Sequence, residues 1–115
     1  MALNLAPIGA LTRSFDSVAD GAKFECPTGT TFGAKQIVEL RDHVLSNRGL
    51  DCVINLNESG QTFLYYNFKR KTYNLTRYSY TIKVSVAEEW AMVLEERNGF
   101  INHCDLQLEP NPQSN

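Results

Sequence analysis

The sequence lacks most of the short motifs that define a chemical function. It contains no glycine-rich phosphate loop, no GxSxG, no HExxH and no zinc-ligand spacing, which argues against the commonest nucleotide-hydrolysing, hydrolase and metalloprotease sites. His103 and Cys104 are neighbours, but catalytic Cys/His pairs normally meet from separate segments. We therefore predict a protein that is not an enzyme, with no metal, no cofactor and no small-molecule substrate.

Cysteine is also scarce. Cys26, Cys52 and Cys104 are an odd number at wide spacing, which argues against a disulfide framework and against a CxxC metal site. The sequence favours small, buried or half-buried free thiols in a reducing compartment, although it assigns no role to any of the three.

Long apolar runs are absent as well. The first 15 residues lack a basic segment, so they predict neither a signal peptide nor a membrane span. Hydrophobic residues make up 43% and charged residues 21% of the 115 positions, which is typical of an ordinary globular chain. We expect a single domain covering residues 1–115, a cytoplasmic location and no membrane partner.

The most informative absence is that of acidic residues between Glu58 and Glu88. Exposed protein surfaces normally mix both signs of charge, and the whole chain has a net charge of −2. A local excess of cations with hydroxyls and tyrosines suits phosphate contacts and base stacking, so it predicts an RNA-facing surface. The alternative is that these cations only solubilise the open face of a sheet. The candidate RNA-binding residues are Lys69, Arg70, Lys71, Tyr73, Arg77, Ser79, Thr81 and Lys83.

Within this interval, residues 77–86 alternate strictly between polar and apolar side chains. Successive side chains of a strand point to opposite faces, so the pattern predicts one buried face and one open face. The buried face would carry Tyr78, Tyr80, Ile82 and Val84.

The rest of the chain predicts an α+β fold. Turn signals such as Asp20-Gly21 indicate N-terminal hairpins, and residues 52–56 and 62–68 indicate further strands of an antiparallel meander. Residues 34–47 fit either a helix or a strand, and their β-branched residues favour the strand. Residues 85–97 open with a capping box at Ser85 and predict a C-terminal helix, with 100–108 as a second short helix or an extended arm.

One helix would leave much of a long sheet uncovered, so we expect a homodimer in which helices of the partner cover the face. Trp90 would be the main anchor of that contact. The predicted residues of the core and dimer interface are Tyr78, Tyr80, Ile82, Val84, Trp90, Val93 and Leu94.

This succession of hairpins, a meander, a strand with a cationic face and a C-terminal helix resembles the coat proteins of single-stranded RNA phages, the levivirus-like family. The segment Tyr80-Thr81-Ile82-Lys83-Val84 is similar to a strand of the RNA-facing sheet in that family. The resemblance implies a capsid protein whose dimers complete one sheet, self-assemble into a shell and package RNA, found in the virion and before assembly in the host cytoplasm. It places Arg77, Ser79, Thr81 and Lys83 on the RNA-contacting strand. Two alternatives stay open, namely a non-viral nucleic-acid-binding module and a small protein-binding inhibitor with a tyrosine-rich sheet.

Overall fold

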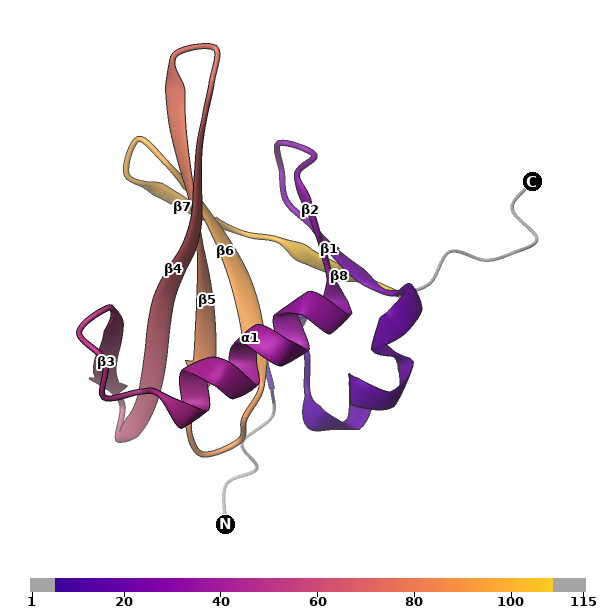
Figure 1. The fold of residues 1–115 in the computed structure, drawn as a ribbon, viewed down its shortest axis with the longest axis vertical. Helices are drawn as coiled ribbons and strands as arrows, with labels where there is room; N and C mark the ends of the chain where they lie inside the picture. Colours follow the sequence, from indigo (N-terminus) through magenta and orange to yellow (C-terminus); the bar gives the residue numbers. More distant parts are fainter. Residues whose placement is uncertain (1–5, 109–115) are drawn as a thin grey trace.

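The computed structural model describes residues 6–108 of the chain. One 3₁₀-helix, one α-helix and eight strands follow each other in this range (Figure 1). Their bounds are η1 Arg13–Gly21, β1 Lys23–Glu25, β2 Thr31–Gly33, α1 Ala34–Ser46, β3 Val53–Glu58, β4 Gln61–Tyr73, β5 Thr76–Ser85, β6 Ala91–Arg97, β7 Phe100–His103 and β8 Asp105–Gln107.

The strands form two antiparallel sheets. The larger sheet has five strands in the order β3-β4-β5-β6-β7, so each strand pairs with its neighbours in sequence. The smaller sheet has the order β2-β1-β8, which pairs the beginning of the fold with its end. Helix α1 crosses one face of the larger sheet, and the β1–β2 hairpin stands beside it (Figure 1).

The predicted C-terminal helices are wrong, because the chain from residue 91 to residue 107 forms β6, β7 and β8. Ser85 does act as a cap, since its Oγ accepts from the Glu88 amide at 3.1 Å, but it closes only one turn. Glu89 then takes a left-handed conformation with φ 60°, and the chain reverses into β6. The stretch from Ala91 to Leu94 is apolar throughout because β6 is buried on both faces, a pattern that a helix also produces.

The preference for a strand over residues 34–47 is also wrong, since α1 occupies Ala34–Ser46. Ile37, Arg41 and Val44 are the buried positions in the last three turns, at the spacing of one helical stripe. Arg41 is fully buried and lies in the middle of that stripe. The sequence showed this helical spacing, and the β-branched residues that favoured a strand lie within the helix.

The predicted burial of one face of β5 is confirmed. Tyr78, Tyr80, Ile82 and Val84 are at most 9% exposed and belong to the main hydrophobic core beneath α1 and the small sheet. The single chain therefore covers this face with its own helix and its own hairpin, and the expected partner helices are not needed there.

Cys26 and Cys104 form a disulfide across a sequence separation of 78 residues, which corrects the expectation of free thiols. Both cysteines are 2% exposed, and they join the end of β1 to the segment between β7 and β8. Cys52 is free and exposed. The disulfide therefore ties the small sheet to the edge of the large one.

Arg41 is the anchor between α1 and η1. Its guanidinium donates to both carboxylate oxygens of Asp16, at 3.1 and 2.7 Å, and to Asp42 at 3.1 Å. Hydrogen bonds from Arg41 lower the pKa of Asp16, so this carboxyl stays ionised in the fold. The pair holds the 3₁₀-helix against the α-helix through a buried charge.

The other face of the large sheet is covered near the β5–β6 turn. Trp90 packs there against Phe63, with ring centroids 5.7 Å apart, and against Ala10 and Met92. Trp90 is 4% exposed, and its Nε1 is the one buried side-chain polar atom in residues 6–108 without a hydrogen-bond partner. Trp90 is thus a core residue of the single chain.

Candidate nucleic-acid interface

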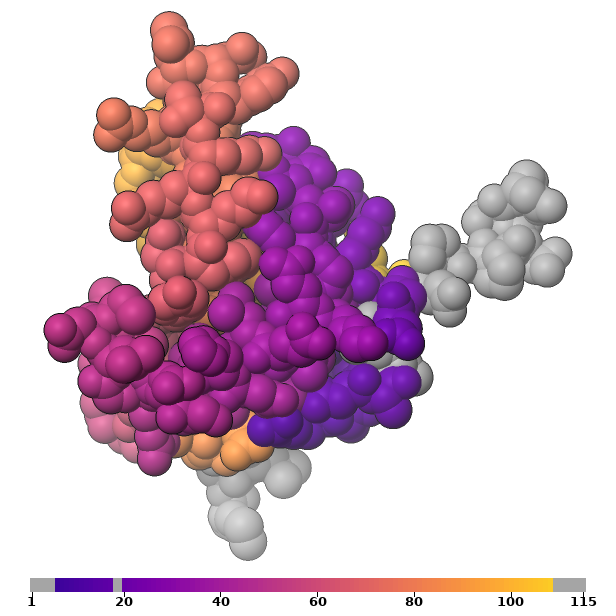
Figure 2. All heavy atoms as spheres, viewed as in Figure 1, coloured from indigo at the N-terminus to yellow at the C-terminus, as the bar shows by residue number. Residues whose placement is uncertain are grey.

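The distal halves of β4 and β5 form an arm, defined here as residues 69–80 (Figure 1). β6 pairs with residues 78–80 at the base of the arm, and beyond them the arm is two-stranded and extends past the rest of the sheet. A register shift between Asn67 and Lys69 bends β4 where the arm begins. The turn Asn74-Leu75 closes it, with both residues at positive φ (49° and 64°). In Figure 2 the end of the arm stands clear of the surrounding surface.

The pairing of β4 with β5 divides the predicted RNA-binding residues between two faces. Arg70 lies opposite Ser79, and Arg77 lies opposite Thr72, which places these four side chains on the face turned away from α1. Thr81 and Lys83 continue the same face toward the body of the sheet. Lys69, Lys71 and Tyr73 lie on the other face of the arm, together with Tyr78 and Tyr80.

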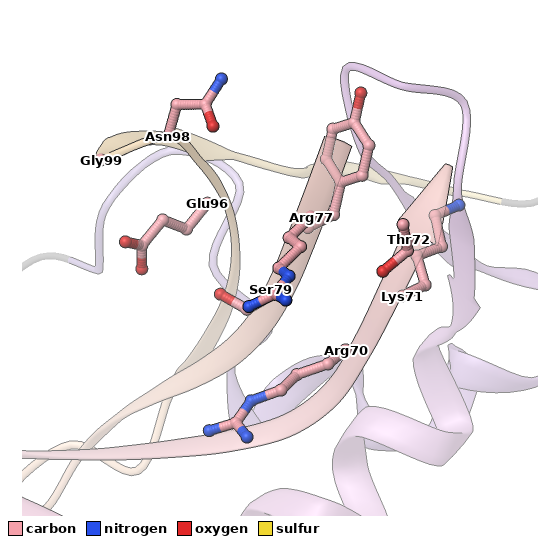
Figure 3. A pocket seen from close by; sticks show the side chains of 9 residues that line it. Arg70, Lys71, Thr72, Arg77, Ser79, Glu96, Asn98 and Gly99 are labelled. Carbon is pink, nitrogen blue, oxygen red and sulfur yellow. The ribbon is translucent and has the colours of Figure 1, made fainter. Parts of the chain in front are cut away.

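On the face turned away from α1, an open depression of about 790 Å³ lies between the arm and the β6–β7 turn. We call it the arginine trough; it is lined by Arg70, Lys71, Thr72, Arg77, Tyr78, Ser79, Glu96, Asn98 and Gly99. Figure 3 shows the side chains of Arg70 and Arg77 along its floor, with the carboxylate of Glu96 turned away from them. Arg70 and Arg77 are exposed, and neither takes part in an ion pair within residues 6–108.

Lys83 differs from these arginines, because its charge is already used within the fold. Its Nζ lies 3.6 Å from a carboxylate oxygen of Glu58 and 4.6 Å from the centroid of the Phe63 ring. Tyr65 completes this group, since its hydroxyl donates to Glu58 at 3.0 Å. Burial, more than any other cause, raises the pKa of Tyr65, so the phenol stays protonated and keeps donating. Lys83 is therefore less available to a phosphate than Arg70 or Arg77.

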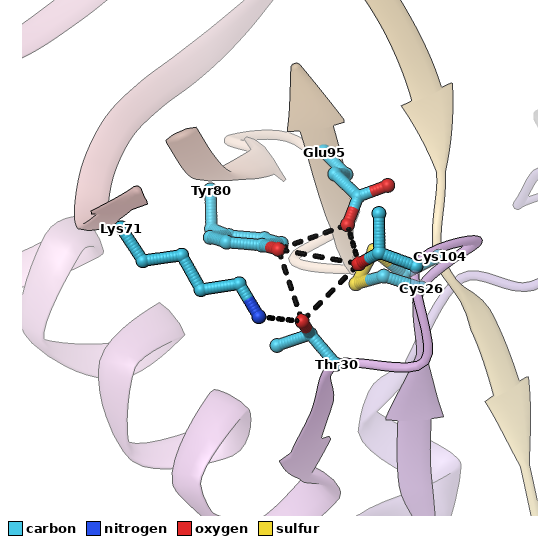
Figure 4. Close-up of a disulfide and its surroundings, with 7 residues drawn as sticks. Cys26, Thr30, Lys71, Tyr80, Glu95 and Cys104 are labelled. Carbon is cyan, nitrogen blue, oxygen red and sulfur yellow. Dashed lines mark hydrogen bonds between the residues drawn. A yellow bond between two sulfur atoms is a disulfide. The ribbon is translucent and has the colours of Figure 1, made fainter. Parts of the chain in front are cut away.

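Lys71 is engaged on the opposite face, in a polar cluster beside the disulfide (Figure 4). Its ammonium donates to Thr30 Oγ1 and lies 5.9 Å from the centroid of the Tyr80 ring. The Tyr80 hydroxyl donates to Glu95 at 2.9 Å, and Thr28 donates to the same carboxylate oxygen. Glu95 is only 3% exposed, so these hydroxyls satisfy a buried acid. The cluster fixes the base of the arm against the β1–β2 loop.

Lys69 and Tyr73 are exposed on that same face of the arm. Tyr73 is 64% exposed and borders a second, smaller depression of about 330 Å³, together with Thr28, Lys71 and Tyr78. The candidate RNA-binding residues therefore lie on both faces of the arm, rather than on one flat surface.

Four residues of the trough were absent from the sequence prediction, namely Thr72, Glu96, Asn98 and Gly99. Thr72 follows directly from the hairpin register once the Asn74-Leu75 turn is recognised, because that turn pairs Thr72 with Arg77. Asn98 and Glu96 could not be placed, because Asn98-Gly99 fits the end of a helix as well as a tight turn: both use positive φ, here 51° and 84°.

The residues predicted for the core and dimer interface lie on both faces of the large sheet. Val93 lies with Tyr78, Tyr80, Ile82 and Val84 in the main core. Leu94 pairs with Thr81 on the other face and is 8% exposed. All of these side chains are covered within one chain, so a homodimer stays a prediction that their burial does not require.

Comparisons with protein-family models, with curated proteins and with solved structures find no match to this chain. Within residues 6–108, no group of three or more His, Cys, Asp or Glu side chains is arranged to hold a metal ion. The same range contains no helix of the length and apolarity needed to cross a bilayer.

Proposed function

We propose that the protein binds single-stranded RNA through the arginine trough and the arm that borders it. The observation that carries this proposal is the pair Arg70 and Arg77, which share one face of the arm and have no carboxylate partner in the described chain. Two unpaired guanidinium groups on a concave, hydroxyl-bearing surface favour phosphate oxygens, which arginine binds in a bidentate manner.

Hydrogen-bond donors surround the two arginines. Thr72 and Ser79 lie opposite them in the hairpin, and Asn98 borders the trough from the β6–β7 turn. Hydroxyl and amide groups beside arginine are the usual additional contacts to phosphate and sugar. Because the whole chain carries a net charge of −2, binding depends on this local surface and not on a global field.

Assembly into a viral shell is a separate prediction with less support. It depended on C-terminal helices that would cover the sheet of a partner, and residues 91–107 form strands instead. The proposal is therefore limited to RNA binding, and the resemblance to phage coat proteins adds only the expectation that the RNA is single-stranded.

The test is the salt dependence of RNA binding. For a 20-nucleotide single-stranded RNA, each lost phosphate contact should reduce the slope of log K against log[salt] by about 0.7. We expect the double variant Arg70→Gln/Arg77→Gln to reduce the slope by about 1.4 and to weaken binding at low salt. Both side chains are exposed, so stability should change by no more than about 0.5 kcal/mol.

The matched control is Lys23→Gln/Arg48→Gln, which removes the same charge from two exposed positions that form no ion pair within residues 6–108. Lys83→Gln is a second comparison, and we expect it to have a smaller effect than either arginine because Glu58 already neutralises Lys83. If both double variants weaken binding equally, the trough is not the site. If the wild type does not bind the RNA at low salt, the proposed function is wrong.

A further inference from the structure

The large sheet contains three two-residue hairpin turns, and one of them departs from the rule that the other two follow. The turns are Ser59-Gly60, Asn74-Leu75 and Asn98-Gly99, and all six residues have positive φ. Such turns strongly prefer glycine at the second position, because a Cβ atom is strained there. Two turns carry that glycine, whereas the arm carries Leu75 at φ 64°.

Leu75 gains no packing in return for its strained backbone. Its side chain is 97% exposed, so the leucine is fully solvated at the end of the arm. The backbone conformation of Leu75 destabilises the folded state, and no burial of its side chain offsets that cost. Local strain of this kind is characteristic of binding positions.

The surroundings of Leu75 indicate what it contacts. Tyr73, two residues before it, is also exposed, and Arg77 and Arg70 lie in the second and fourth residue pairs from the turn. No acidic residue occurs between Glu58 and Glu88, and Glu96 is the one acidic side chain that lines the trough, so cations outnumber acids at this end of the described chain. A partner with phosphates beside flat apolar rings matches both the cations and the leucine, and nucleic acid has that chemistry.

We propose that Leu75 is a wedge that inserts between two neighbouring bases of the strand whose phosphates lie on Arg70 and Arg77. The inference rests on the proposed RNA-binding function and adds a specific role for the end of the arm. Apolar side chains, leucine among them, separate stacked bases when cations hold the backbone nearby. The leucine is thus kept at a position where glycine would give a more stable turn.

The critical variant is Leu75→Gly, which should raise the denaturation midpoint and at the same time weaken RNA binding. We expect a loss of affinity of roughly fivefold or more for a 20-nucleotide single-stranded RNA. Affinity for inorganic polyphosphate, which has charges and no bases, should not change. An RNA carrying 2-aminopurine should show a fluorescence increase on binding the wild type, because the base is unstacked, and little increase with Leu75→Gly.

Two further variants separate the wedge from a general effect of the turn. Leu75→Phe keeps a large apolar side chain at the same backbone position and should retain RNA affinity and the fluorescence increase. Ile8→Asn removes an equally exposed apolar side chain from the segment before η1 and should change neither.

The outcomes distinguish this inference from the proposed function. If Leu75→Gly binds RNA as tightly as the wild type, while Arg70→Gln/Arg77→Gln weakens it, the wedge is overturned and RNA binding stands. If the wild type binds neither RNA nor polyphosphate, both are overturned. A parallel loss of affinity for RNA and polyphosphate in Leu75→Gly would also overturn the wedge, because it would show a change in the arm and not a contact with bases.

Discussion

Loss of the Cys26–Cys104 disulfide is expected to remove a large part of the stability of the fold. The bond closes a loop with a sequence separation of 78 residues. In the chain-entropy model, opening a loop of that length returns roughly 15 cal/mol/K to the unfolded chain, or about 4.5 kcal/mol at room temperature. Since domains of this size are stable by about 5–15 kcal/mol, the reduced protein should be marginally stable.

Urea denaturation followed by tryptophan fluorescence measures this loss. Trp90 is the one tryptophan in the sequence and is 4% exposed, so its emission should change when the chain unfolds. We expect a small dithiol reductant, or the double variant Cys26→Ser/Cys104→Ser, to lower the midpoint by roughly 2–4 M urea. The slope should also increase, because the unfolded chain without the cross-link is less compact.

Cys52→Ser is the control, since Cys52 is exposed and unpaired. It should unfold at the wild-type midpoint and should show the same sensitivity to reductant. If the oxidised protein and the Cys26→Ser/Cys104→Ser variant unfold at the same midpoint, the disulfide does not constrain the unfolded chain and the reasoning is refuted.

Two further predictions concern the buried side chain of Trp90 and the half-buried side chain of Asp16. Trp90→Ala should lower the free energy of unfolding by about 3–5 kcal/mol, measured by circular dichroism. Trp90→Phe should lower it by less than about 1.5 kcal/mol, because phenylalanine keeps a ring and removes an unpartnered N–H. Equal losses in the two variants would show that the ring is not packed. The folded-state pKa of Asp16 is lowered by hydrogen bonds from Arg41, so its stabilising effect should be complete well above the unfolded pKa of about 3.9 and be lost as the pH falls through the folded value. Thermal unfolding from pH 6 to pH 2 should therefore show a steeper loss for the wild type than for Asp16→Asn, and parallel curves would contradict this.

The sequence was most informative where one face of a strand is buried and the other is open. The alternation in residues 77–86 correctly predicted β5 and its buried face. The acid-free interval is an uneven charge distribution along the chain, but it could not show which cations are engaged. That depends on tertiary neighbours such as Glu58, which neutralises Lys83, and Thr30, which binds Lys71.

The errors arose where burial departs from simple periodicity. Arg41 interrupts the apolar stripe of α1 because its buried charge is paired with Asp16, 25 residues earlier. Residues 91–94 are buried on both faces of β6, so they lack the alternation that indicates a strand. The pairing of Cys26 with Cys104 depends on β8 returning to β1, and spacing alone does not encode that contact.

The pairing of β8 with β1 has a consequence for how the chain matures during synthesis. The five-stranded sheet is a meander of sequence neighbours and can form as each hairpin leaves the ribosome. The small sheet cannot be completed in this way, because Phe24 of β1 pairs with Leu106 of β8, which is synthesised more than eighty positions later. Until then β1 has one unpaired edge and Cys26 has no disulfide partner, so the nascent protein carries a free thiol and an open strand edge beside the five-stranded sheet.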